Sequence, residues 1–144
     1  MKNIFDKYNF NNEYYEQDIS YVLEQIENGN YTILPNSISN GKVLKIIYDG
    51  NIDNDGYERG YLVLPYGSSI NEHTHTNSIE QYMIISGGLA INGENMLINE
   101  CFIGDTHSID PVLDLTIIRT IKISKELYEE YCNQRVKTIG GINE

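Results

Sequence analysis

Residues 67–87 read GSSINEHTHTNSIEQYMIISG, and this stretch decides the fold class. Two histidines, His73 and His75, stand two positions apart in it. Side chains two apart on an extended strand point to the same face of a sheet. Both imidazoles can therefore reach one point, as a metal site requires. Glu80 begins the next β-rich run, and if the two runs pair, it can supply a carboxylate oxygen to the same ion.

Short β-rich runs lie on both sides of this stretch. They cover residues 31–34, 43–48, 57–64, 80–85, 89–92, 95–98 and 113–123. Turn sequences rich in Asp, Asn and Gly separate them. Many short strands at close spacing predict an antiparallel sandwich or barrel.

Helices are expected at the two ends of this β-rich region. Residues 12–28 place apolar side chains at helical spacing, and Gly29 can end that helix. Ser124 can cap a last helix over residues 125–135, and residues 136–144 are expected to form a frayed tail. The sequence thus predicts an N-terminal helical extension (1–30), a β-barrel (31–124), and a C-terminal helix and tail (125–144).

Composition excludes several classes of protein. The chain has 144 residues, with 10 Lys+Arg against 21 Asp+Glu and a net charge of −11. That length predicts one domain. The charge argues against nucleic acid and against an anionic membrane surface as partners. The first residues lack the apolar run of a signal peptide, and two cysteines are too few for a disulfide scaffold. We therefore expect a cytoplasmic protein.

The histidine stretch resembles the first motif of the cupin superfamily. That motif runs Gly, five residues, His-x-His, three or four residues, Glu, six residues, Gly. Its fixed positions are met by Gly67, His73, His75, Glu80 and Gly87. With this composition, a chance match has a probability on the order of 10⁻⁵ to 10⁻⁴.

The second cupin motif, Gly, five residues, Pro-x-Gly, two residues, His, three residues, Asn, is matched in part. Gly104 and His107 keep the spacing, whereas Phe102 replaces the proline and Pro111 the asparagine. The leading glycine, which is best assigned to Gly93, stands too far upstream. These departures concern the loop geometry more than the ligand, because His107 falls where the third histidine of the family falls.

The resemblance covers roughly residues 40–123, and it implies an all-β fold, a small antiparallel jelly-roll barrel, here with flanking N-terminal and C-terminal helices. It implies one divalent transition metal, whether Fe, Mn, Ni, Co, Zn or Cu, held by His73, His75, Glu80 and His107. It also implies a small-molecule ligand or substrate and a homodimer. The alternative for each histidine is a structural or solvated side chain, and the alternative for Glu80 is a surface charge.

Strand alternation adds further candidates for the pocket. Tyr82 shares parity with Glu80 and is predicted to face inward as a catalytic or supporting hydrogen-bond donor, with a core or rim tyrosine as the alternative. Arg59 and Tyr61 share one face of their strand, and an inward Arg59 would bind a substrate carboxylate or act in catalysis, unless it lies at the surface. Arg119 lies on an apolar face, so it should be paired or line a wet pocket that binds substrate.

The sequence therefore predicts a metal-dependent cupin, most simply an enzyme acting on a small anionic or hydroxylated metabolite. The reaction type stays open among dioxygenase, isomerase or epimerase, and lyase, because the fold hosts all of them. One alternative is a non-catalytic module that uses the metal to bind an effector and acts as a sensor. Another is a structural oligomer with a vestigial site. For Cys101, a buried structural thiol is favoured over a catalytic one.

Overall fold

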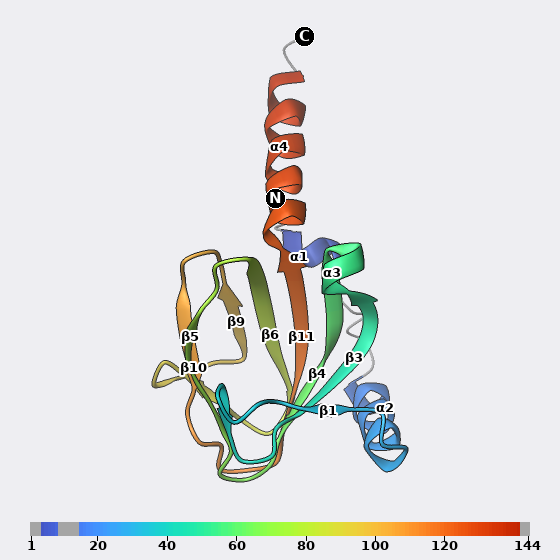
Figure 1. Ribbon diagram of the computed structural model, residues 1–144, viewed down its shortest axis with the longest axis vertical. Helices are drawn as coiled ribbons and strands as arrows, with labels where there is room; N and C mark the ends of the chain where they lie inside the picture. Colours follow the sequence, from blue (N-terminus) through green and yellow to red (C-terminus); the bar gives the residue numbers. More distant parts are fainter. Residues whose placement is uncertain (1–3, 9–14, 142–144) are drawn as a thin grey trace.

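A computed structural model describes residues 4–8 and 15–141, and it contains two antiparallel β-sheets with helices at their margins (Figure 1). The six-stranded sheet has the order β1 (Thr32–Ile33), β3 (Leu44–Asn51), β4 (Tyr57–Leu64), β11 (Thr116–Ser124), β6 (Ser78–Ser86) and β9 (Ile98–Cys101). The five-stranded sheet has the order β2 (Ser39–Asn40), β5 (Ser69–Thr74), β10 (Thr106–Ile109), β7 (Ala90–Ile91) and β8 (Glu94–Asn95). The helices are α1 (Ile4–Lys7), α2 (Tyr15–Glu27), α3 (Ile52–Asp55) and α4 (Lys125–Gly141).

The main core lies between the two sheets. Leu62, Tyr82 and Ile118 contribute from the six-stranded sheet, and Ile70 and Ile109 contribute from the five-stranded sheet. All five side chains are buried. Every second side chain of each strand faces this core, because successive side chains on a strand point to opposite faces. The inner face of the larger sheet therefore forms one wall of the barrel.

Helix α2 covers the outer face of the larger sheet, beside β3 (Figure 1). Val22 of the helix is fully buried against Ile46, Tyr61, Val63 and Ile117. Burying a Val or Ile side chain stabilises a fold by about 1.5–3 kcal/mol, so this interface fixes the helix to the sheet. As a result, the central strands of this sheet are buried on both faces.

Helix α4 begins where β11 ends and projects away from the barrel (Figure 1). Ser124 caps it, because the backbone N–H of Leu127 donates to Ser124 Oγ at 3.2 Å, as predicted. Leu127, Tyr128 and Phe5 of α1 pack together in a third apolar cluster at the base of the helix.

Most predicted elements are present, but strands β2 and β10 were not among the predicted runs, and three further corrections apply. Helix α4 continues to Gly141, so the prediction of a frayed tail from residue 136 was wrong for residues 136–141; no glycine or proline interrupts the helix before Gly140. Two single-turn helices, α1 and α3, were not predicted, because four residues are too few for a periodic signal. The run predicted over 95–98 is divided between β8 and β9. The predicted start of the first helix lies outside the described residues.

Within the described ranges, residues 4–8 and 15–141, no helix combines the length and the apolar character needed to span a membrane.

Candidate metal centre

Two neighbouring strands of the smaller sheet position the three histidines. His73 lies on β5 and His107 on β10, and these two residues are direct partners in the antiparallel register. His75 follows the end of β5, where its backbone N–H donates to the carbonyl of Asp105 at 3.1 Å. Residues two apart share a face, so all three side chains point to the same side of the sheet, as predicted for the first two.

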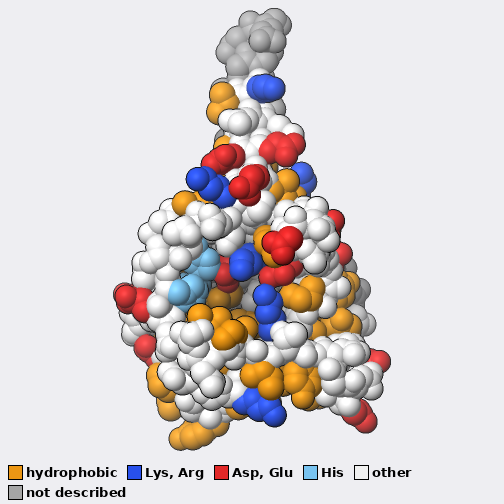
Figure 2. Space-filling view, in the orientation of Figure 1, with side chains coloured by type: hydrophobic (Ala, Val, Ile, Leu, Met, Phe, Trp, Pro, Cys, Tyr) orange, Lys and Arg blue, Asp and Glu red, His pale blue; other side chains and the backbone are white. Residues whose placement is uncertain are grey.

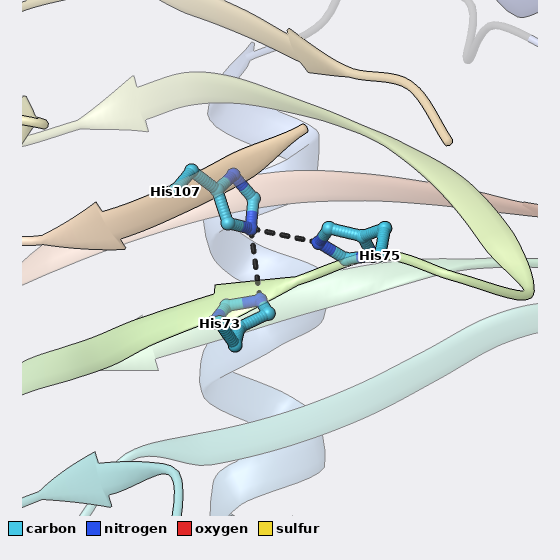
Figure 3. Close-up of side chains that lie close together, drawn as sticks. All are labelled: His73, His75 and His107. Atoms are coloured by element: carbon cyan, nitrogen blue, oxygen red, sulfur yellow. Dashed lines mark hydrogen bonds between the residues drawn. The ribbon is translucent and has the colours of Figure 1, made fainter. Parts of the chain in front are cut away.

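The three imidazoles meet at a single point (Figure 3). His107 Nε2 lies 2.9 Å from His75 Nε2 and 2.9 Å from His73 Nε2. The ring centroids are 4.5–4.9 Å apart, and the rings are inclined to one another by 62–82°. His75 and His107 are buried, at 6% and 2% exposure. Among the described residues, this is the group of ligand-type side chains whose donor atoms gather closely enough to hold an ion.

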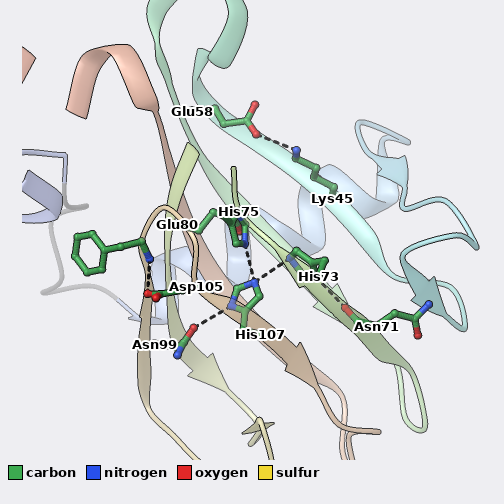
Figure 4. A network of polar contacts seen from close by, with 10 residues as sticks. Lys45, Glu58, Asn71, His73, His75, Glu80, Asn99, Asp105 and His107 are labelled. Atoms are coloured by element: carbon green, nitrogen blue, oxygen red, sulfur yellow. Dashed lines mark hydrogen bonds and ion pairs between the residues drawn. The ribbon is translucent and has the colours of Figure 1, made fainter. Parts of the chain in front are cut away.

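The other nitrogen of each imidazole faces an oxygen atom (Figure 4). His73 Nδ1 lies 2.8 Å from the backbone carbonyl of Asn71, and His107 Nδ1 lies 3.0 Å from Asn99 Oδ1. His75 Nδ1 lies 3.3 Å from Glu80 Oε1. Each Nδ1 thus has an acceptor for a proton, which assigns the Nδ1–H tautomer to all three rings.

That tautomer leaves three Nε2 lone pairs directed at one another. A pair of unprotonated nitrogens 2.9 Å apart has no proton to share, so the contacts are repulsive unless a cation lies among them. Neutral imidazoles whose second nitrogen donates to an outer oxygen are the arrangement found at transition-metal sites. The residues present therefore fit a divalent metal held by His73, His75 and His107.

Electrostatics keep the donors neutral. Burial lowers the pKa of His107 to about 4, and the positive charge that His73 or His75 would carry acts in the same direction. Burial also lowers the pKa of His75, assisted by His73 and Lys122 and opposed by Glu80. Both rings are therefore unprotonated near neutral pH, which is the state that binds a metal.

Glu80 lies beside this cluster on the inner face of β6. Its carboxylate contacts His75 at Nδ1, the nitrogen that is not in contact with His107. It also forms a hydrogen bond with Tyr82. In this arrangement Glu80 orients His75, and a role as the fourth ligand stays a prediction.

Tyr82 faces inward, as predicted. It is 5% exposed, and its ring stacks on His107 with centroids 5.1 Å apart and planes inclined by 19°. Burial raises the pKa of its hydroxyl well above the usual value, and the charge of Glu80 adds to the effect. The phenol therefore stays protonated, and it can donate a hydrogen bond to Glu80. Cys101 is buried and burial raises its pKa to about 12, which fits a structural thiol.

Arg59, Tyr61 and Arg119 do share the parities expected of them, but they lie on the outer face of the larger sheet. The Tyr61 hydroxyl donates to Asp18 of α2 at 2.7 Å, and Arg119, 2% exposed, pairs with the same carboxylate. Arg59 pairs with Asp49 at 2.6 Å. The prediction that these side chains face the pocket was wrong, because α2 covers this sheet face and buries its apolar residues. For Arg119, the paired alternative is confirmed.

Sequence reasoning missed the charged residues that do line the pocket. Lys45, Glu58 and Lys122 are on the inner face together with Glu80 and His73. Lys45 Nζ lies 2.9 Å from Glu58 Oε1. Their positions on the strands gave a signal, because Glu58 and Lys122 have the opposite parity to Arg59 and Arg119. Parity alone separates the two sets of residues. It identifies the set that faces the cavity only when the outer face of the sheet is already known.

The cavity beside the histidines is small, about 110 Å³. Its apolar walls are formed by Leu34, Ile38, Leu62 and Ile70, and Tyr82 and Thr120 complete the lining. Figure 2 shows the histidine surface next to a hollow in which basic and acidic side chains gather. A larger cavity of about 460 Å³ lies elsewhere, between the segments 84–90, 95–97 and 111–114. Of the three histidines, His73 lines the smaller cavity and none lines the larger one, so the smaller one is the candidate site.

Comparisons with known proteins agree with this architecture. No protein-family model matches the chain, and no curated protein matches it in sequence. An acetylacetone dioxygenase from Acinetobacter johnsonii is similar in structure, with a TM-score of 0.55 and 15% identity over 66% of this chain and 68% of that one. A predicted oxalate decarboxylase from Thermotoga maritima has a TM-score of 0.56 and 21% identity, over 66% and 92% of the two chains.

A third similar structure is the cupin domain of Cnp3 from Schizosaccharomyces pombe, with a TM-score of 0.51 and 12% identity over 66% of this chain and 74% of that domain. At these identities the likeness establishes the fold. The protein therefore has the cupin fold, an antiparallel jelly roll, as predicted from its two motifs. Within that fold, its three histidines form a group that could bind a metal.

Proposed function

We propose that this chain is a metal-dependent cupin enzyme that acts on a small anionic or hydroxylated metabolite. The observation that carries the proposal is the convergence of three Nε2 atoms, in which His107 Nε2 lies 2.9 Å from each of the other two. When bound, a divalent metal supplies Lewis-acid chemistry at this point. Imidazole donors suit Fe, Mn, Ni, Co, Zn or Cu, so the metal is to be identified by experiment.

The chain's own residues have separable roles in this proposal. His73, His75 and His107 hold the metal, and Glu80 orients His75. Tyr82 stacks on His107 and donates to Glu80, which makes it a positioning residue. The apolar side of the cavity excludes water from the substrate, and the small volume restricts the substrate to a few carbon atoms.

The acetylacetone dioxygenase and the predicted oxalate decarboxylase support a catalytic role, since both are named for reactions on small oxygen-rich molecules. They do not share one reaction, and the reaction type of this chain is left open between an oxygenase, an isomerase or epimerase, and a lyase.

The test begins with metal analysis of protein made without a histidine tag. The chain has three histidines in all, so every imidazole belongs to the proposed site. We expect one equivalent of a divalent metal in the wild type and loss of that metal in His75→Ala. Oxygen uptake and product formation are then measured for metal-loaded and metal-free protein across a panel of small metabolites. Absence of stoichiometric metal at every load tested would contradict the proposal and favour a structural oligomer.

A second candidate function is a non-catalytic module in which the metal site binds an effector. The observation that favours it is α4, which projects from the barrel (Figure 1) and on which Val136 is 68% exposed. Such a helix could transmit ligand binding to another protein. A ligand that raises the melting temperature of the metal-loaded protein, but yields no product, would favour this function over catalysis. The predicted homodimer stays a prediction, and light scattering after size exclusion tests it.

A further inference from the structure

Three strands of the larger sheet place a row of charges on the wall of the small cavity. In the antiparallel register, Lys122 of β11 lies directly between Glu58 of β4 and Glu80 of β6. All three line the cavity together with His73. The charges of these cross-strand neighbours alternate along the row: Glu58 is negative, Lys122 positive and Glu80 negative.

Both carboxylates in this row have closer partners than Lys122. Glu58 is paired with Lys45 at 2.9 Å, and Glu80 contacts His75 and Tyr82. Within the described part of the chain, Lys122 forms no ion pair or hydrogen bond that occupies its ammonium group. Lys122 is partly buried beside the small cavity, and withdrawing an ammonium group from water is costly without an anion.

The charge of the wall points to the same ligand. The charges of Lys45, Lys122, Glu58 and Glu80 on this wall sum to zero. A divalent metal adds two positive charges, so the loaded site has a surplus of positive charge that a small anion would neutralise.

We propose that Lys122 is the anchor for the carboxylate of a short 2-hydroxy or 2-oxo acid whose second oxygen is directed at the three histidines. This inference rests on the proposed function, because the second oxygen needs a metal to bind. The cavity volume of about 110 Å³ is well below the ~300–1,000 Å³ of sites for drug-sized ligands. It is equivalent to about four water molecules at about 30 Å³ of liquid each, so it fits a ligand of only a few non-hydrogen atoms.

Lactate and its neutral analogue lactamide test the role of charge at nearly constant shape. Their affinities for metal-loaded protein are measured by calorimetry for the wild type, Lys122→Gln and Lys122→Arg. We expect Lys122→Gln to weaken lactate binding about 10- to 100-fold, as for a lost hydrogen bond between charged groups. Lactamide binding should change less than threefold, and Lys122→Arg should retain most of the lactate affinity. Pyruvate and glycolate extend the series.

Lys125→Gln is the matched control. It removes the same charge from the first turn of α4, where the side chain is 47% exposed and pairs with Glu129. We expect no change in lactate affinity. Metal content is measured on every sample, so that failure of the proposed function, seen as a wild type without metal, is distinct from failure of the anchor. Unchanged lactate affinity in metal-loaded Lys122→Gln would contradict the proposal that Lys122 binds the carboxylate. Equal weakening of lactate and lactamide binding would contradict it as well. So would a metal-loaded wild type that binds none of the acids.

Discussion

Replacing His107 with glutamine should make the metal-free protein less sensitive to acid. In the folded state, burial lowers the pKa of His107 to about 4, against about 6.5 in an unfolded chain. The unfolded chain therefore takes up a proton more readily, and the folded state loses stability as the pH falls below about 6.5. The loss develops through the window between about 6.5 and 4. Above that window His107 is neutral in both states and contributes no pH dependence.

The magnitude follows from the two pKa values. At pH 5 the unfolded chain gains about 2 kcal/mol from protonation of this imidazole that the folded chain does not gain. His107 is 2% exposed, so solvent screening removes little of that effect. Wild-type protein should thus lose about 2 kcal/mol more unfolding free energy between pH 7.5 and pH 5 than His107→Gln.

The assay is urea denaturation in the presence of a chelator, at pH 7.5 and at pH 5, for both proteins. All other titrating groups are common to the two chains, so the difference between the two pH dependences isolates the imidazole. Excess metal at pH 7.5, without chelator, provides a second test. At a metal concentration of 100 times Kd, binding should stabilise the wild type by about 2.7 kcal/mol and the variant much less. Identical pH dependence in the two chelated proteins would refute the reasoning.

Three further substitutions separate the roles of the surrounding residues. Asn99→Ala removes the acceptor at Nδ1 of His107, and a chelator competition should show metal affinity reduced by about 10- to 100-fold. Asp18→Asn removes a carboxylate from a buried ion pair beneath α2, and it should lower the urea-derived unfolding free energy by about 3 kcal/mol while metal affinity is unchanged. Gly60→Ala would place a Cβ atom 2.0 Å from a backbone oxygen of β3, so it should lower the melting temperature sharply, whereas Gly88→Ala, with open space around it, should not.

The fold was predictable because its signals are local in sequence. The spacing of Gly67, His73, His75, Glu80 and Gly87 fits a strand, a turn and a second strand, and the structure contains β5 and β6 there. Period-two alternation correctly placed Tyr82 on the same face as Glu80. This reasoning needed only to know which residues share a face of a strand, and a regular strand determines that whatever surrounds it.

The cationic residues of the pocket were not predictable in the same way. Alternation groups Arg59 with Tyr61, and it groups Glu58 with Leu62, but it does not say which group faces the barrel interior. A strand with one polar face answers that question by its composition. Here both faces carry apolar residues, because Val22 of α2 buries the outer one. The choice therefore depends on a helix about forty residues away in sequence.

The two faces of the larger sheet use different cations, and the chemistry of the side chains accounts for the division. On the outer face, Arg119 is enclosed beneath α2 with the carboxylate of Asp18. A guanidinium is planar, always charged and weakly hydrated, so it suits a permanent ion pair in a buried site. On the inner face, Lys45 and Lys122 border the cavity in which we propose that a small anion binds. An ammonium group on a flexible stem can follow a small anion into and out of such a site, since it demands no fixed bidentate geometry.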